Sequence, residues 1–107
     1  MKKINNFSIK PDLRDRYKII SYKKRLTMRE LLELDIKDLL TNERECYKAV
    51  GTPECSATLT VAIDSNIKKE MMGYKKLHGV TLRDIVITAM VNRVMKEDGP
   101  VQPFDLI

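Results

Sequence analysis

The chain of 107 residues contains no tryptophan, six aromatic residues, two cysteines and one histidine. With so few aromatic side chains, we expect a mainly aliphatic core of the kind formed between small packed helices. Cys46 and Cys55 lack the spacing of zinc ligands, and His78 lies in the other half of the sequence, so no metal site is indicated. No apolar run approaches the roughly 18 residues of a membrane-spanning helix, and the sequence shows no signal peptide. We therefore expect a soluble cytoplasmic protein, in which free thiols are favoured over a disulfide between Cys46 and Cys55.

Patterns typical of enzymes are missing as well. The sequence has no nucleophile–base pair, no glycine-rich phosphate loop and no two carboxylates spaced for acid–base chemistry. We therefore expect neither an enzyme nor a bound cofactor. A group of methionines is interpreted as core filler and not as a ligand or partner groove; it comprises Met71, Met72, Met90 and Met95.

The net charge of +5 is unevenly distributed along the chain. Residues 1–26 hold nine basic and two acidic residues, whereas residues 27–56 hold four basic and seven acidic ones. The trend repeats, with four basic and two acidic residues in 57–80 and three basic and four acidic residues in 81–107. Each half thus begins basic and ends acidic. This favours a polyanion bound on one side of the fold, and a solvated helix face is the alternative.

The second half predicts one strand followed by two helices. Residues 57–63 alternate between large apolar and small or polar types, which predicts a half-buried strand with Leu59, Val61 and Ile63 inward. A helix over roughly 65–77 follows, capped by Asp64 or Ser65 and stopped by Gly79. Thr81 with Asp84 resembles a capping box and begins a second helix that runs from Leu82 to about Lys96.

The first half predicts the same elements. Residues 5–9 form a short strand with Phe7 and Ile9 inward. Pro11 opens a helix, and Thr27 with Glu30 forms a capping box before the next one. We expect this second helix to reach residue 42, with an extension through Arg44 toward Val50 as the alternative to a linker.

The two halves align without a gap when one is shifted by 54 positions. Across the strand, helix and turn units the apolar positions coincide, although few residues are identical, namely Ile9/Ile63, Thr27/Thr81 and Arg29/Arg83. One strand with two helices cannot bury its apolar face alone, so we expect the two copies to pack together. The predicted fold is mainly α with a two-stranded antiparallel β-ribbon, in which the two repeats form an intramolecular pseudo-dimer. Its parts are a first repeat (1–42), a linker or helix extension (43–56), a second repeat (57–98) and an extended or disordered tail (99–107).

A strand, a capped helix, a turn and a second capped helix within about 40 residues resemble the ribbon-helix-helix family of DNA-binding proteins, which includes the Arc and MetJ repressors. The resemblance covers residues 4–42 and 57–96. The second copy is the closer match because of Gly79-Val80-Thr81, whereas the first copy has Arg25 in place of Gly79. Two such units in one polypeptide resemble relaxosome accessory proteins of the TraY type.

The resemblance implies that the ribbon enters the major groove and that its outward side chains read base edges. In this sequence the implied readers are Asn6, Ser8, Thr58, Thr60 and Ala62. Ala62 and its neighbour Ile4 are poor readers, so weak specificity is expected. The alternative is that these residues only suit a strand face in water.

The resemblance also implies phosphate contacts at the N-terminus of each second helix. The implied backbone contacts are Lys2, Lys3, Lys10, Thr27, Arg29, Thr81 and Arg83. Two alternatives remain open. The threonines can serve only as helix caps, and Arg29 and Arg83 can pair with Glu33 and nearby acids.

The favoured function is therefore a sequence-preferring double-stranded DNA-binding protein. It would act as a transcriptional repressor or as an accessory factor in the processing of plasmid or other mobile DNA, such as conjugation, and copies could assemble further on DNA. Because the two strands differ, we expect an asymmetric site. The alternative is an antitoxin or adaptor that binds a protein partner through residues 100–107, which include Phe104, Leu106 and Ile107.

Overall fold

The computed structural model describes residues 2–42, 46 and 57–99. Within these residues it contains two strands and four helices, in the order β1 (Lys2–Ile9), α1 (Pro11–Lys23), α2 (Met28–Thr41), β2 (Ala57–Asp64), α3 (Ser65–His78) and α4 (Leu82–Asp98). The fold is mainly helical with one two-stranded antiparallel sheet, as predicted. The possible extension of the second helix toward Val50 and the tail 100–107 lie outside the described residues. No helix of the described part is long and apolar enough to cross a membrane.

β1 and β2 form a ribbon in which Asn6 lies opposite Thr60. These residues are 54 positions apart, so the register matches the offset that aligns the two halves of the sequence. Burial alternates along both strands, because successive side chains of a strand point to opposite faces. The buried face carries Phe7, Ile9, Ala57, Leu59, Val61 and Ile63. β1 starts earlier than predicted because its ladder with β2 continues to the Lys2–Asp64 pair.

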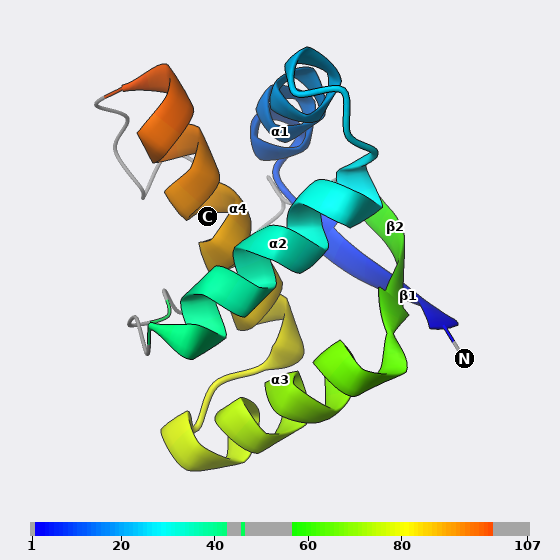
Figure 1. Cartoon of the computed structure of the whole chain (residues 1–107), viewed down its shortest axis with the longest axis vertical. Coiled ribbons are helices and arrows are strands. Elements are labelled where there is room, and N and C mark those ends of the chain that lie inside the picture. Colours follow the sequence, from blue (N-terminus) through cyan, green and yellow to red (C-terminus); the bar gives the residue numbers. More distant parts are fainter. Residues whose placement is uncertain (1, 43–45, 47–56, 100–107) are drawn as a thin grey trace.

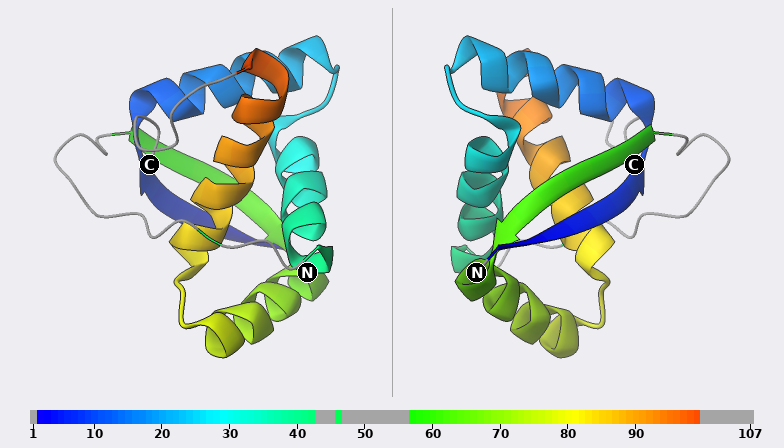
Figure 2. Two further views of the ribbon diagram at one scale, coloured as in Figure 1. Left: turned by 90° about the vertical axis from the view of Figure 1, so that its left-hand side faces the viewer. Right: turned by 90° about the vertical axis from the view of Figure 1, so that its right-hand side faces the viewer.

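The four helices cover the buried face of the ribbon (Figure 1). α1 packs against α4, α3 packs against α2, and α2 and α4 pack against each other. Each half therefore buries its apolar residues mainly against the other half. In the right-hand view of Figure 2 the ribbon lies in front of α4, and no described helix covers its outer face. α4 is the most enclosed helix, with every residue from Asp84 to Val91 buried.

Both second helices begin with the predicted capping boxes. At α2 the Thr27 hydroxyl accepts from the Glu30 backbone N–H, and the Glu30 carboxylate accepts from the Thr27 N–H. At α4 Thr81 and Asp84 exchange the same two bonds, so the shorter aspartate side chain also closes the box. Asp64 caps α3 through the Asn66 N–H. Pro11 begins α1, and its N-cap, Lys10, makes no side-chain cap bond.

The methionine group does not behave as one cluster. Met71 and Met90 are fully buried, and Met95 packs at the edge of the core. Met72 is 38% exposed, so the expectation that it fills the core is wrong. It follows Met71 directly on α3, and adjacent helical residues point about 100° apart, so the two cannot share one narrow apolar face.

Candidate nucleic-acid interface

The outer face of the ribbon carries the residues expected to read bases. Asn6 and Ser8 of β1 and Thr58 and Thr60 of β2 are exposed, and Ala62 is half-exposed. The structure thus brings all five predicted readers onto one open surface. The largest apolar group on this face is Ile4, at 72% exposure. The predicted readers on this face have short side chains, and a two-stranded ribbon fits the major groove.

The centre of this face is fixed by a cross-strand hydrogen bond. Thr60 Oγ1 donates to Asn6 Oδ1 at 2.7 Å. The bond orients the Asn6 amide, whose NH₂ group is a donor and whose oxygen has a second lone pair. A bidentate contact to adenine requires one donor and one acceptor from the same amide. Asn6 retains both capacities while Thr60 holds it in place.

The outer face differs in chemistry on the two sides of Asn6 and Thr60. At one end Ser8 lies opposite Thr58, which places two hydroxyls side by side. On the other side, one pair before this face reaches the Lys2–Asp64 end of the ladder, Ile4 lies opposite Ala62, which places two apolar groups together. Hydroxyls can donate to or accept from base edges, whereas apolar groups contact the thymine methyl. The ribbon therefore presents two unlike half-surfaces on either side of Asn6 and Thr60.

The N-termini of α2 and α4 already hold carboxylates of their own. The Thr27 and Thr81 hydroxyls cap the helices at 3.1 Å from the Glu30 N–H and 3.0 Å from the Asp84 N–H. Both threonines therefore serve as helix caps, as the alternative interpretation predicted. The pKa of Glu30 is lowered from its ordinary value of 4.5, first by the Thr27 backbone N–H and then by the Thr27 hydroxyl. A phosphate at this helix end would have to lie beside that carboxylate.

The two predicted arginines occupy different surroundings. Arg29 Nη1 lies 3.6 Å from Glu33 Oε1, which is the alternative pairing considered from the sequence. Arg83 Nε instead donates to the Ser8 carbonyl oxygen at 2.7 Å. The start of α4 is thereby held against β1. A phosphate near Ser8 would lie within reach of this guanidinium.

Of the three predicted lysines, only Lys10 has its side chain in the described part of the chain. Lys10 is half-exposed at the N-terminus of α1. Lys2 and Lys3 belong to β1, but their side chains lie outside the described part. Lys68 of α3, which the sequence did not single out, donates from Nζ to Asn5 Oδ1 of β1 at 2.9 Å.

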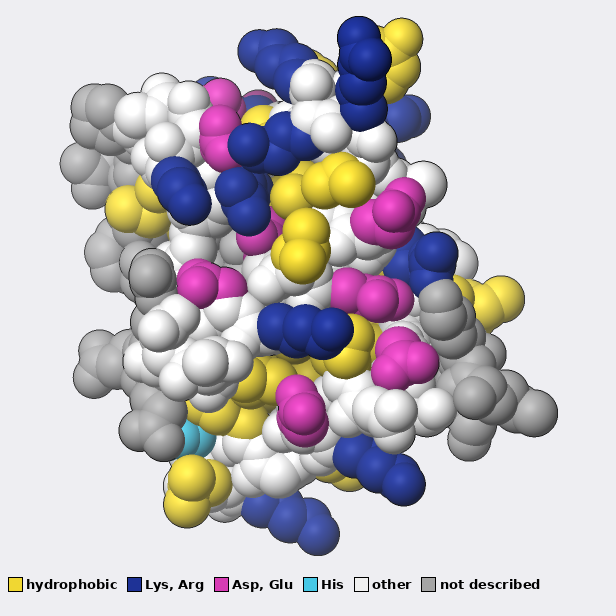
Figure 3. All heavy atoms as spheres, in the orientation of Figure 1, with side chains coloured by type: hydrophobic (Ala, Val, Ile, Leu, Met, Phe, Trp, Pro, Cys, Tyr) yellow, Lys and Arg dark blue, Asp and Glu magenta, His cyan; other side chains and the backbone are white. Residues whose placement is uncertain are grey.

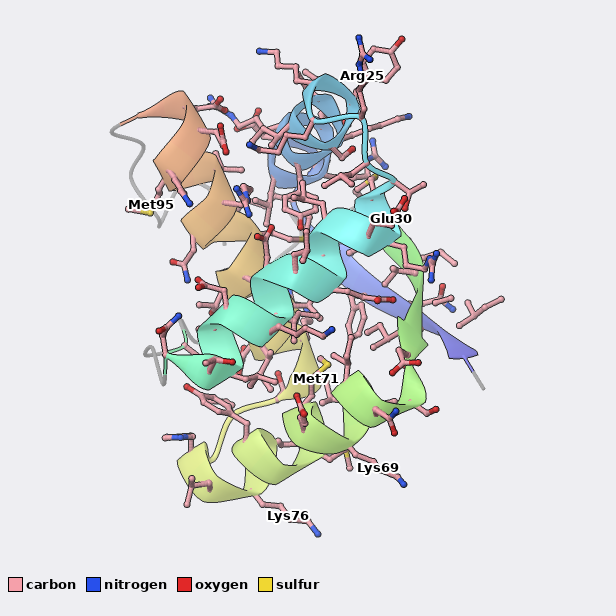
Figure 4. All side chains as sticks on the ribbon, in the orientation of Figure 1. Arg25, Glu30, Lys69, Met71, Lys76 and Met95 are labelled. Carbon is pink, nitrogen blue, oxygen red and sulfur yellow. The ribbon has the colours of Figure 1, made fainter. Side chains whose placement is uncertain are left out.

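Charge is distributed over the helices much as the sequence indicated. Figure 3 shows the face formed by α2, where acidic side chains lie across the middle and most basic ones lie toward α1 and α3. In Figure 4, Glu30 lies at the start of α2, Arg25 lies at the turn before it, and Lys69 and Lys76 point away from α3 into solvent. This face therefore carries both signs of charge.

Two other predictions concern cysteines and metals. Cys46 is a free, half-buried thiol that packs against the core, and burial is the main cause of its raised pKa. Cys55 and the tail 100–107 lie outside the described residues. Within the described part, no group of His, Cys, Asp and Glu is arranged to hold a metal ion.

Comparison of the chain with protein-family models, with curated proteins and with solved structures found no match. The resemblance to ribbon-helix-helix proteins therefore rests on the residues and the geometry of this chain.

Proposed function

We propose that this protein binds double-stranded DNA by inserting the ribbon of β1 and β2 into the major groove. The observation that carries the proposal is the open outer face of the ribbon, with short, mostly polar side chains around Asn6 and Thr60. Support comes from Arg83, which lies at the ribbon edge beside Ser8. A two-stranded ribbon fits the major groove, where each base pair presents a distinct pattern of donors and acceptors.

The proposal includes a single-chain pseudo-dimer of two ribbon-helix-helix repeats. The strand, the helix caps and the turn between helices recur at an offset of 54 residues. Asn6 and Thr60 occupy equivalent positions of the two repeats and also face each other in the ribbon. An approximate two-fold axis would therefore pass between them. α2 contacts β2 and α4 contacts β1, as such an axis requires.

The unlike pairs on the two sides of Asn6 and Thr60 predict an asymmetric DNA site. The Ser8–Thr58 pair would read one half-site through hydroxyls, and the Ile4–Ala62 pair would favour thymine methyls in the other. Occupying such a site in a promoter would repress transcription. Binding such a site next to the point where mobile DNA is processed would be the role of an accessory factor in DNA transfer.

The first test is selection of binding sites from a random double-stranded DNA pool at near-physiological salt. We expect one short asymmetric motif. Asn6→Ala and Ser8→Ala should each relax base preference at a distinct position, by about 1–3 kcal/mol per lost contact. The matched controls are Thr41→Ala and Asn42→Ala at the C-terminal end of α2, which remove exposed polar groups away from the ribbon.

The outcomes separate the possibilities. An unchanged motif in both ribbon variants would reject the ribbon as the reader. A perfect inverted repeat would indicate two chains pairing like repeats and would contradict the pseudo-dimer. Binding without enrichment that disappears as salt rises would leave only contacts to the phosphate backbone and would reject sequence preference.

A further inference from the structure

A buried polar cluster joins three helices on one side of the core. Tyr17 Oη of α1 donates to Asp35 Oδ2 of α2 at 2.7 Å. Arg93 of α4 donates to the same carboxylate from Nε at 3.0 Å and from Nη2 at 2.6 Å. Tyr17 is fully buried and Asp35 is 7% exposed. Burial, followed by the Asp35 charge, raises the pKa of Tyr17 far above its ordinary value, so the phenol remains a donor.

The equivalent place in the other half is entirely apolar. An offset of 54 residues relates Tyr17 to Met71, Asp35 to Ala89 and Arg93 to Leu39. Met71, Ala89 and Leu39 are all buried, and they lie on α3, α4 and α2, the helices that correspond to α1, α2 and α4. At these three positions the core is therefore polar on one side of the approximate axis and apolar on the other.

This difference bears on which repeats can pair. Two first repeats would place Leu39 against Asp35 and leave a buried carboxylate without its arginine. Two second repeats would place Arg93 against Ala89 and leave a guanidinium without its acid. A buried charge that loses its partner is strongly destabilising, because it has given up water and gained nothing in return. Only a first repeat against a second repeat satisfies both charges.

We propose that Asp35 and Arg93 define a pairing surface whose one acceptable partner is the unlike repeat of this same chain sequence. Asp35 selects against a second copy of the first repeat, and Arg93 selects against a second copy of the second. Tyr17 supports the pair by occupying another lone pair of Asp35. The inference rests on the paired repeats of the proposed function but not on DNA binding, so either can fail without the other.

The test is complementation between two full-length charge-reversal variants. The Asp35→Arg variant has arginine at positions 35 and 93, and the Arg93→Asp variant has aspartate at both of these positions. Each variant alone should show a weakened or absent cooperative unfolding transition, with the unfolded fraction raised about 100-fold or more. When the two are unfolded together and refolded in equal amounts, the first repeat of each chain can pair with the second repeat of the other. We expect a mixed dimer that regains the native helical signal and unfolds cooperatively.

Circular dichroism and mass by light scattering measure these effects. The control pair is Asp38→Arg and Lys96→Asp, which makes the same charge changes at exposed positions of α2 and α4; each control should fold alone as a monomer. A chain carrying Asp35→Arg and Arg93→Asp together should also refold as a monomer.

Three results would overturn the proposal. In the first, the single reversals are no less stable than the controls. In the second, the mixture behaves as the sum of its two parts. In the third, the double variant is as unstable as the singles, which would show that the Asp35–Arg93 pair does not determine pairing.

Discussion

The two halves of the chain build the same helix–helix turn from different residues. Gly79 ends α3 with φ of 65°, and Arg25 follows α1 with φ of 56°. Both turns close with a backbone bond across five residues, from Leu26 N–H to the Ser21 carbonyl and from Val80 N–H to the Lys75 carbonyl. The left-handed conformation is unfavourable for a residue with a Cβ. The capped helix that follows each turn therefore determines its path, even where the residue is poorly suited to it.

In the core the relation between residues and backbone is reversed. At the turn, unlike residues give the same backbone. In the core, matching backbone positions carry the Asp35–Arg93 pair in one place and Ala89 with Leu39 in the other. Repeated backbone geometry thus leaves the chemistry of each site free to diverge. Divergence within the core is what can distinguish one repeat from the other.

The largest predicted effect comes from breaking the polar cluster. Asp35→Ala leaves Arg93 largely buried without its main partner and should lower the free energy of unfolding by about 3–5 kcal/mol. The triple variant Tyr17→Met, Asp35→Ala and Arg93→Leu copies the apolar counterpart and should recover most of that loss, because apolar replacement of a whole buried pair is often neutral or stabilising. Urea unfolding followed by circular dichroism measures both. A triple variant as unstable as Asp35→Ala would show that the two sides of the core are not interchangeable.

The next effect concerns the two turns. Gly79→Ala should lower the free energy of unfolding by about 1 kcal/mol. Alanine is strained at positive φ, and this strain exceeds the gain that comes from reducing the freedom of the unfolded chain. Arg25→Gly should stabilise the protein by up to about 1 kcal/mol for the converse reason. A Cβ at Gly79 meets no other atom within 4 Å, so the change reports on the backbone alone. Thermal unfolding of both variants provides the measurement, and two shifts of the same sign would contradict the comparison.

Much of the fold could be predicted because its signals are local. Alternation in 57–63 and 5–9 predicted the buried face of the ribbon, and Thr27 and Thr81 predicted where α2 and α4 begin. The same alternation predicted which side chains would be exposed on the outer face. These patterns depend on residues only two to four positions apart in sequence.

What could not be predicted depends on contacts between distant residues. Asp35 looked like one more charge on an acidic helix, and only its partner 58 positions away reveals why it is buried. The bonds from Thr60 to Asn6 and from Arg83 to Ser8 likewise depend on the register of the ribbon and the placement of α4. Composition and periodicity contain no information on such pairs.

The smallest effect concerns the response to acid of an ion pair that joins the two halves. Glu97 accepts from Lys24 and Arg93, and these contacts, the Lys24 hydrogen bond foremost, lower its pKa from 4.5. A carboxyl with a lowered pKa in the folded state binds protons more readily when unfolded, so its contribution is present above about pH 5 and is lost as pH falls through and below 4.5.

Glu97→Gln should therefore flatten the fall in stability on acidification, and Lys24→Met should flatten it less, because Arg93 still lowers the pKa of Glu97 in that variant. Because Glu97 is exposed, the contribution should also shrink as salt screens it. Urea unfolding at pH 3.5 and pH 7, in low and high salt, tests both points. Glu97 joins Arg93 and so extends the polar cluster to the surface. If neither variant changes the acid response, Glu97 does not contribute to the stability of the cluster, which is then limited to Tyr17, Asp35 and Arg93.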